Sequence, residues 1–193
     1  MDKLETLEVS GTPEDIGFAI GQADADSIQK QVLQLAEFRE TERTWQDSSY
    51  LKMLDAVARS VFPEYVLELE GMARGAQVEY ETLLIWNCRG DLPLSDDAIP
   101  ESAKHSPEGC TTLLYPAAKS SVAVIAHNED GPPELDGHCC WLSVRQENGS
   151  KFSTFHYPGM LPGYTFSVNS HGLVQTINNI RVDDLQSGIP HWC

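Results

Sequence analysis

The hydrophobic pattern of the chain changes its period near residue 105. Before this point, apolar residues recur at the spacing of helices, as Ile16, Ile20 and Ile28 illustrate. After it, short runs rich in β-branched and aromatic residues alternate with Pro-Gly, Asn-Gly and His-Gly turns, which is the pattern of strands. Helices followed by strands predict an α+β chain with an antiparallel sheet.

The element boundaries follow from this pattern. The first helix is expected to begin at Thr12 and Pro13, a capping residue followed by a proline in the first turn, and to continue to Leu35. Further helices are expected at 50–62, 63–75 and 80–87, the last burying Leu83, Leu84 and Trp86. Strands are expected at 111–115, 121–126, 139–146, 151–157, 165–169 and 173–178. The chain therefore divides into a helical segment, 1–109, and a strand segment, 110–193.

The charge of the chain excludes two classes of partner. With 29 acidic and 13 basic residues among 193, the formal net charge is −16. Nucleic acids and anionic membrane surfaces both select proteins with clustered lysine and arginine. No segment approaches the roughly 20 apolar residues that span a membrane. We therefore expect no nucleic-acid partner and no membrane partner.

The five cysteines predict reduced thiols. Their number is odd, their spacing is irregular, and the first residues lack the apolar stretch of an export signal, so we expect a cytoplasmic protein. His138 precedes the adjacent Cys139 and Cys140, but no C-x-x-C motif and no second ligand pair accompany them. We expect these thiols to be structural, and we expect neither a metal nor another cofactor.

The segment Gly109-Cys110-Thr111 predicts self-cleavage. It joins the polar stretch 102–109 to the first β-branched run. Because glycine has no Cβ, a thiol that follows it can attack the carbonyl carbon behind it and convert the peptide bond to a thioester. Hydrolysis would leave Cys110 with a free α-amine (pKa about 8) beside its thiol (pKa about 8.5), so one residue would supply base and nucleophile. Free cysteine is also commonly buried, so on these residues alone a structural role stays open.

Several motifs occur in an order that resembles one known family. They are Gly11-Thr12-Pro13 with Ile16-Gly17 and Gly21, the stretch 68–76, Asn87-Cys88-Arg89, Gly109-Cys110-Thr111, Asn128-Glu129-Asp130-Gly131, and Leu161-Pro162-Gly163-Tyr164 leading to 168–173. This order is similar to the isopenicillin N acyltransferases, also called acyl-coenzyme A:6-aminopenicillanic acid acyltransferases, within the N-terminal-nucleophile hydrolases. Each motif alone is common, whereas their order along nearly the whole chain is specific.

The resemblance implies a four-layer αββα sandwich that cuts itself between Gly109 and Cys110. Residues 1–109 would become the smaller subunit, and 110–193 would begin the larger one. The product would be a cysteine amidohydrolase or acyltransferase that acts on a small N-acyl compound, such as a penicillin side-chain amide or a β-alanyl amine, through a thioester acyl-enzyme. Because the family's fold continues beyond this length, we expect a chain truncated at its C-terminal end that pairs with another copy or needs its missing part.

The resemblance also suggests further site residues. Asp130 matches the family's aspartate near the nucleophile and would hold the α-amine, with its backbone N–H near the oxyanion. Asn178 would bind the oxyanion or the leaving amide, and Asn179 the substrate. His127 and Arg89 are candidates for the substrate pocket. Each residue also has an ordinary interpretation, because Asn-Glu-Asp-Gly suits a hairpin turn, a histidine at a strand end is usually hydrogen-bonded, and an arginine often pairs with an acid.

Two other functions remain open on the sequence. A thiol hydrolase that needs no cleavage would pair Cys110 with a histidine such as His127 or His156. A binding or assembly domain without enzymatic activity would simply bury Cys110.

Overall fold

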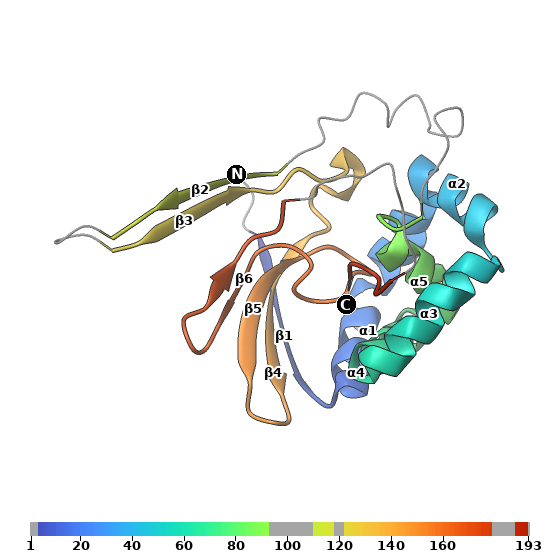
Figure 1. The fold of residues 1–193 in the computed structure, drawn as a ribbon, viewed down its shortest axis with the longest axis horizontal. Coiled ribbons are helices and arrows are strands. Elements are labelled where there is room, and N and C mark those ends of the chain that lie inside the picture. Colours follow the sequence, from blue (N-terminus) through green and yellow to red (C-terminus); the bar gives the residue numbers. More distant parts are fainter. Residues whose placement is uncertain (1–3, 93–109, 118–121, 179–187, 193) are drawn as a thin grey trace.

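The computed structural model describes residues 4–92, 110–117, 122–178 and 188–192. These residues form one sheet with the helices gathered on one side of it, and a separate two-stranded hairpin that projects away from this body (Figure 1). The mixed helix and strand content confirms the α+β class. Gly109 and Asn179, two of the expected site residues, lie outside the described residues.

The described residues contain five α-helices: α1 (Pro13–Lys30), α2 (Ala36–Trp45), α3 (Ser49–Val61), α4 (Pro63–Ala76) and α5 (Tyr80–Cys88). The expected N-terminus of α1 is confirmed: Thr12 Oγ1 accepts from the Asp15 backbone N–H at 3.2 Å and donates to the Asp15 carboxylate at 2.7 Å. The helix ends at Lys30, earlier than expected, because Val32 belongs to a short 3-10 helix, η1 (Val32–Gln34). The positions of α3, α4 and α5 agree with the sequence pattern, and α2 was not predicted.

The large sheet has the strand order β1-β4-β5-β6-β7. Its strands are β1 (Glu5–Gly11), β4 (Cys140–Gln146), β5 (Lys151–His156), β6 (Ser167–Asn169) and β7 (Val174–Gln175). The last four pair antiparallel, as expected, although β6 and β7 are shorter than their apolar runs. The expectation of a purely antiparallel sheet is wrong at β1, which runs parallel to β4 with Leu7 opposite Leu142 and Val9 opposite Val144. The helical segment therefore contributes an unpredicted strand to this sheet.

The hairpin consists of β2 (Thr111–Tyr115) and β3 (Val124–Asn128). The expected strand at 111–115 is confirmed, whereas the second strand begins and ends later than the predicted 121–126. Thr112 pairs with His127. The same register places Asn128 opposite Thr111. Residues just after β3 therefore lie beside the residue just before β2, Cys110.

Helices α1 and α4 pack with their backbones almost in contact. A Cβ added to Gly17 would lie 1.8 Å from the Glu68 carbonyl oxygen, and one added to Gly21 would lie 2.0 Å from the Met72 carbonyl oxygen. Two glycines of α4 approach the α1 backbone in the same way. Only glycine permits this distance, so the two helices form one rigid unit beneath the sheet.

Helix α5 is tied to the loop that follows β5. Leu83, Leu84 and Trp86 are buried, as expected, and the Trp86 indole N–H donates to the Pro158 carbonyl oxygen at 3.1 Å. The buried Asn87 amide donates to the Gly159 carbonyl oxygen at 2.9 Å and accepts from a backbone N–H of the same loop. These buried hydrogen bonds fix the helix end next to the loop that lines the candidate site.

The buried carboxyl of Glu68 makes stability depend on pH. The residue is 7% exposed, and burial raises its pKa from 4.5 to about 8. Between pH 4.5 and about pH 8, the folded protein therefore holds a proton that the unfolded chain has released. The stabilising contribution of this proton is complete below pH 4.5 and is lost as the pH rises towards about 8.

We expect Glu68→Gln to remove most of the fall in unfolding free energy between about pH 5 and 8, because glutamine carries no titrating proton. Urea denaturation at several pH values measures this slope. Glu64→Gln, on the exposed side of the same helix, is the control that should keep the wild-type slope. Equal slopes in the two variants would contradict the assignment to Glu68.

Candidate active site

Cys110 lies immediately before β2, with its side chain half-buried. The sulfur is therefore only partly enclosed by side chains. Glu129 and Asp130, the two residues after β3, lie next to it because of the hairpin register. The Asp130 backbone N–H lowers the pKa of the thiol, and the Glu129 carboxylate raises it. The hairpin register therefore brings the expected nucleophile and the expected aspartate together.

His127 completes a compact group of donor atoms with these residues. The Cys110 sulfur, a ring nitrogen of His127 and a carboxylate oxygen of Glu129 all lie within 4.8 Å of one another. His127 Nε2 is 3.1 Å from Glu129 Oε2, and the histidine side chain is only 3% exposed. Its ring also packs against Phe166, with the ring centroids 5.6 Å apart. The histidine is therefore held in place rather than free on the surface.

Burial shifts the titration of both acidic groups in this cluster. Burial has the largest effect and raises the pKa of the Cys110 thiol, while the Asp130 backbone N–H has a smaller effect that lowers this pKa. Burial also raises the pKa of Glu129, opposed by its hydrogen bond with His127. In the uncleaved chain the thiol is consequently protonated at neutral pH, and it needs a base before it can attack a carbonyl carbon.

Asn178 and Thr112 link the nucleophile to His127. The Asn178 amide donates to the Cys110 carbonyl oxygen at 2.5 Å, and its own oxygen accepts from the Thr112 hydroxyl at 2.7 Å. The hydroxyl has one hydrogen, which it directs to Asn178, so it accepts from His127 Nδ1–H at 2.9 Å, and the Thr176 hydroxyl lies 3.1 Å away. This network places a hydrogen on Nδ1, while Nε2 faces the Glu129 carboxylate.

A small cavity of about 70 Å³ adjoins the cluster. Its wall includes Glu129 and Asp130 together with the aromatic side chains of Trp86, Tyr157 and Tyr164, and it also includes Arg89. The Arg89 guanidinium lies over the Trp86 ring, 4.1 Å from its centroid, and donates to the Trp86 carbonyl oxygen. Among the described residues this guanidinium makes no ion pair, although an arginine often pairs with an acid.

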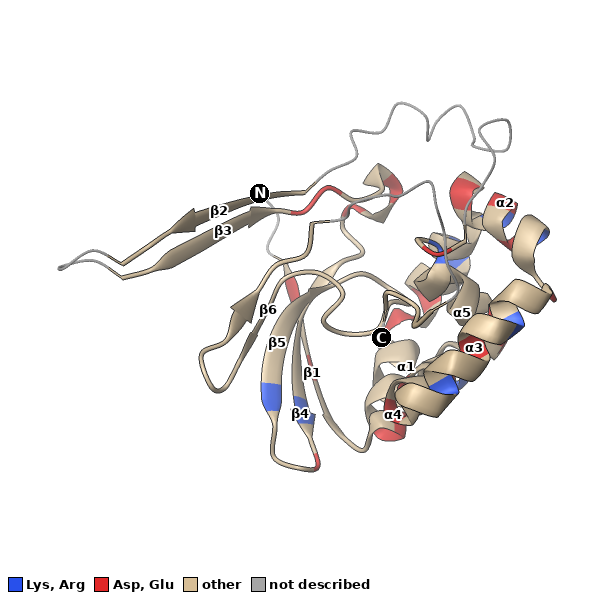
Figure 2. Ribbon diagram, in the orientation of Figure 1, with Lys and Arg blue, Asp and Glu red and all other residues tan. Residues whose placement is uncertain are grey.

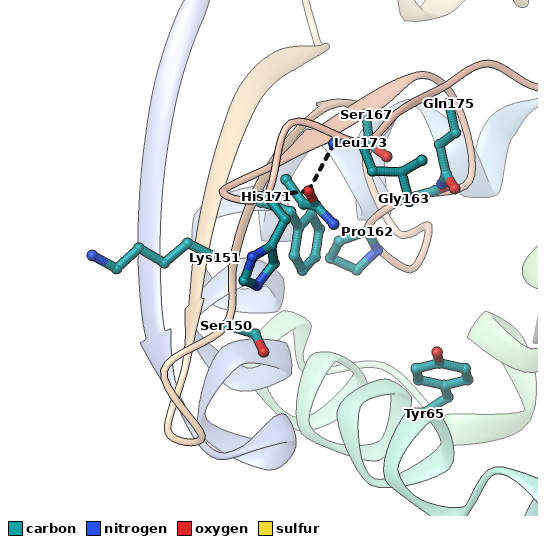
Figure 3. Close-up of a pocket in the computed structure, with 11 residues that line it drawn as sticks. Tyr65, Ser150, Lys151, Pro162, Gly163, Ser167, His171, Leu173 and Gln175 are labelled. Atoms are coloured by element: carbon teal, nitrogen blue, oxygen red, sulfur yellow. Dashed lines mark hydrogen bonds between the residues drawn. The ribbon is translucent and has the colours of Figure 1, made fainter.

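A larger cavity of about 360 Å³ lies elsewhere, beside β5, β6 and β7 (Figure 3). Tyr65 faces it from α4, while Lys151, Pro162, His171 and Gln175 line the side formed by the sheet. None of the described candidate site residues borders this cavity. The described candidate residues therefore group beside the smaller cavity and not beside the larger one.

The structure brings together four of the expected site residues, Cys110, Asp130, Asn178 and His127, and places Arg89 on the adjoining wall. Sequence reasoning missed Glu129 and Thr112 as members of the group. The signal for Glu129 was present, because it occupies the middle of the quoted Asn-Glu-Asp-Gly turn.

His156, the other histidine considered as a partner for the thiol, has a different role. It is buried and lies 2.8 Å from the Asp24 carboxylate, a residue of α1. This pair joins the end of β5 to the helical layer. His127 is therefore the histidine that the structure places beside the nucleophile.

Two comparisons relate the chain to known proteins. Residues 117–193 match the acyl-coenzyme A:6-aminopenicillanic acid acyl-transferase family. The chain is also similar to a protein of Drosophila melanogaster named beta-alanyl-dopamine/carcinine hydrolase, with 32% identity over 203 residues. That alignment covers 96% of this chain and 51% of the relative, so the chain spans about half the length of the curated protein it matches. These matches confirm the resemblance to the acyl-coenzyme A:6-aminopenicillanic acid acyl-transferase family that the motifs indicate.

Proposed function

We propose that this chain carries the nucleophile of a self-processing cysteine amidohydrolase or acyltransferase that acts on small N-acyl compounds. The observation that supports it best is the surroundings of Cys110. The thiol is half-buried, the Glu129 carboxylate lies within 4.8 Å of it, and Glu129 and Asp130 both line the adjoining cavity. A structural cysteine in an assembly domain needs neither a polar cluster nor an adjoining cavity.

In the proposed first step, the Cys110 sulfur attacks the carbonyl carbon of Gly109. The amide nitrogen becomes the α-amine of Cys110, a thioester links the two residues, and water then releases the Gly109 carboxylate. Asn178 supports this step because it holds the Cys110 carbonyl oxygen at 2.5 Å and so fixes the backbone that carries the nucleophile. Residues 1–109 and the part from 110 onwards would then form two subunits.

The proposed catalytic cycle uses the same sulfur. The α-amine takes the thiol proton, the sulfur attacks the substrate carbonyl carbon, and the Asp130 backbone N–H stabilises the oxyanion. The amine product leaves with the transferred proton. Water, or an acceptor amine, then attacks the thioester and regenerates the thiol.

The proposed fold is the αββα sandwich of the N-terminal-nucleophile hydrolases, with the β2–β3 hairpin as the beginning of its second sheet. The hairpin supports this proposal because Leu113, Leu114 and Tyr115 are each more than half exposed on it. A soluble surface rarely carries adjacent apolar side chains of this size without a cover. The remaining part of such a fold, or another copy of the chain, would provide that cover.

A β-alanyl amide is the substrate class we propose. A β-alanyl group carries an ammonium, and the cavity that adjoins the Cys110 cluster offers two carboxylates, Glu129 and Asp130, and three aromatic rings against one cation, Arg89. Carboxylates and aromatic rings both attract cations. The name of the Drosophila melanogaster relative describes a hydrolase of β-alanyl-dopamine and carcinine, which agrees with this class.

Release of free amine from a panel of N-acyl amines tests the proposal. We expect β-alanyl amines to be hydrolysed at least about tenfold faster, in kcat/KM, than N-propionyl amines, which differ only in lacking the ammonium. Faster hydrolysis of the propionyl compounds would contradict the assignment of the substrate. No release from any N-acyl compound would contradict the enzymatic function.

Asp130→Asn is expected to give a processed but poorly active enzyme, with kcat/KM lowered at least about tenfold, because the side-chain charge that orients the α-amine is lost. Mass spectrometry follows processing, and amine release follows turnover. Asp136→Asn, an exposed acid after η2 (Pro133–Leu135), is the matched control. Unchanged turnover in Asp130→Asn would remove this carboxylate from the site.

A second candidate function is a thiol hydrolase that needs no cleavage. It is favoured by the short distances between Cys110, His127 and Glu129, which bring a thiol, an imidazole and a carboxylate together. His127→Gln separates the two candidates. Loss of turnover in a chain that stays intact supports the second, whereas turnover that persists after scission supports the first.

A further inference from the structure

We propose that Cys110, His127 and Glu129 form a binding site for one zinc ion that holds the nucleophile inactive. The binding site itself requires no scission, since its three donors are side chains of the uncleaved chain. Only the inhibitory consequence rests on the proposed function.

The donor atoms have the chemistry and spacing that zinc requires. Thiolate sulfur, imidazole nitrogen and carboxylate oxygen are its usual protein ligands, and three of them with a water in the fourth position form an open tetrahedral site. The three atoms lie within 4.8 Å of one another. His127 Nε2 and Glu129 Oε2 are 3.1 Å apart, close to the edge of about 3.3 Å that zinc bonds of about 2.0–2.1 Å impose on a tetrahedron. A small rotation of the Cys110 side chain completes the arrangement.

The histidine is already oriented as a metal ligand. Its Nδ1–H donates to the Thr112 hydroxyl at 2.9 Å, and that hydroxyl is in turn held by Asn178 at 2.7 Å. Metal-binding histidines commonly donate their second ring N–H to a fixed oxygen in this way, because the bond selects the tautomer and the ring direction. Nε2, the nitrogen left for a metal, therefore lies beside the other two donors.

The surroundings favour a cation. Asp130 adds a carboxylate next to the three donors, and acidic residues gather at the end of β3 and on η2 without lysine or arginine on the described hairpin (Figure 2). The facing cation is Arg89, whose charge lies over the Trp86 ring across the cavity. Within the described ranges, this is the one group of three His, Cys, Asp or Glu donors close enough to share an ion.

Zinc at this position blocks the proposed chemistry. The ion takes the Cys110 sulfur as a thiolate, and the thiol proton is released to solvent. The sulfur lone pair that would attack a carbonyl carbon is then engaged in the zinc bond. Hydrolysis is therefore expected to stop when zinc is added and to return when a chelator removes it.

Calorimetric titration of the chelator-treated protein with zinc chloride tests the site. We expect one ion per chain, with affinity weakened at least about tenfold in each of Cys110→Ala, His127→Gln and Glu129→Gln. Glu129→Gln is the decisive variant, since it keeps the side-chain shape, and the unfolding midpoint without zinc shows whether it folds. His138→Ala and Cys140→Ala, which alter the other neighbouring histidine and thiol, should bind as the wild type does.

Two results would overturn the inference: no binding in the micromolar range, or unchanged binding in all three ligand variants. Cobalt chloride gives an independent readout, because a cobalt–thiolate bond absorbs in the near ultraviolet and this band should vanish in Cys110→Ala. The zinc and the function proposals can fail separately. A protein that binds zinc and releases no amine refutes only the function, and an active protein that ignores zinc refutes only the metal site.

Discussion

Replacing Cys110 with alanine is expected to abolish amide hydrolysis, lowering kcat/KM at least about 10⁴-fold, because no other atom of the cluster can form the acyl-enzyme. The Glu129 carboxylate and the His127 ring nitrogen lie within 4.8 Å of the sulfur, so either can move a proton there. Neither replaces the sulfur as the attacking atom. Amine release from a β-alanyl amine measures the loss.

Two further substitutions show whether the loss of hydrolysis is caused by removal of the Cys110 sulfur. Cys140→Ala removes another half-buried thiol, at the start of β4, and should leave kcat/KM within about twofold. Cys110→Ser keeps a weaker nucleophile and should slow both scission and turnover without eliminating them. Full activity in Cys110→Ala would refute the assigned nucleophile.

Replacing Gly21 with alanine is expected to destabilise the protein by about 3 kcal/mol or more, because the added methyl group would meet a main-chain atom. Its carbon would lie 2.0 Å from the Met72 carbonyl oxygen and 2.9 Å from the Ala76 backbone nitrogen. A flexible side chain could rotate away, whereas a helix backbone cannot. Helices α1 and α4 would have to separate, and this would disturb the layer on which the sheet rests.

Urea denaturation of Gly21→Ala and of a matched variant measures this effect. Gly188→Ala is the control, because a Cβ at Gly188 meets no atom within 4 Å and the residue needs no left-handed backbone conformation. The control should change the unfolding free energy by no more than about 0.5 kcal/mol. Equal stability of the two variants would contradict the close packing of α1 and α4.

Local patterns were sufficient for much of the fold. Helices α3 and α4 and strand β2 lie within a residue of the expected positions, since apolar spacing, a proline at the first turn and a β-branched run report on the backbone around them. The cap at Thr12 is likewise determined by nearby residues. Its partner, Asp15, is three residues away and visible in the sequence.

Non-local pairing explains what was missed. Strand β1 pairs with β4, with Val9 opposite Val144. The residues around Val9 do not indicate a pairing strand so far away in the sequence. Helix α2 was overlooked for a different reason. It buries only Phe38 and Thr41 among its ten residues, and its largely polar composition leaves few apolar residues to mark it.

The candidate site also combines residues that the sequence indicates with residues that only the three-dimensional pairing brings in. Motif order singled out Cys110, Asp130, Asn178 and His127, and the structure places all four together. Glu129 joins them only because the β2–β3 register aligns Thr111 with Asn128 and so brings the next residue beside the sulfur. That register depends on the three-dimensional pairing of two strands, which spacing along the chain does not specify.

The mass spectrum of the denatured protein tests the central claim most directly. If Cys110 severs the peptide bond behind it, the wild type should give two fragments that meet between Gly109 and Cys110, and Cys110→Ala should give one intact mass. A single intact mass for the wild type, or the same two fragments from Cys110→Ala, would contradict self-processing by this thiol.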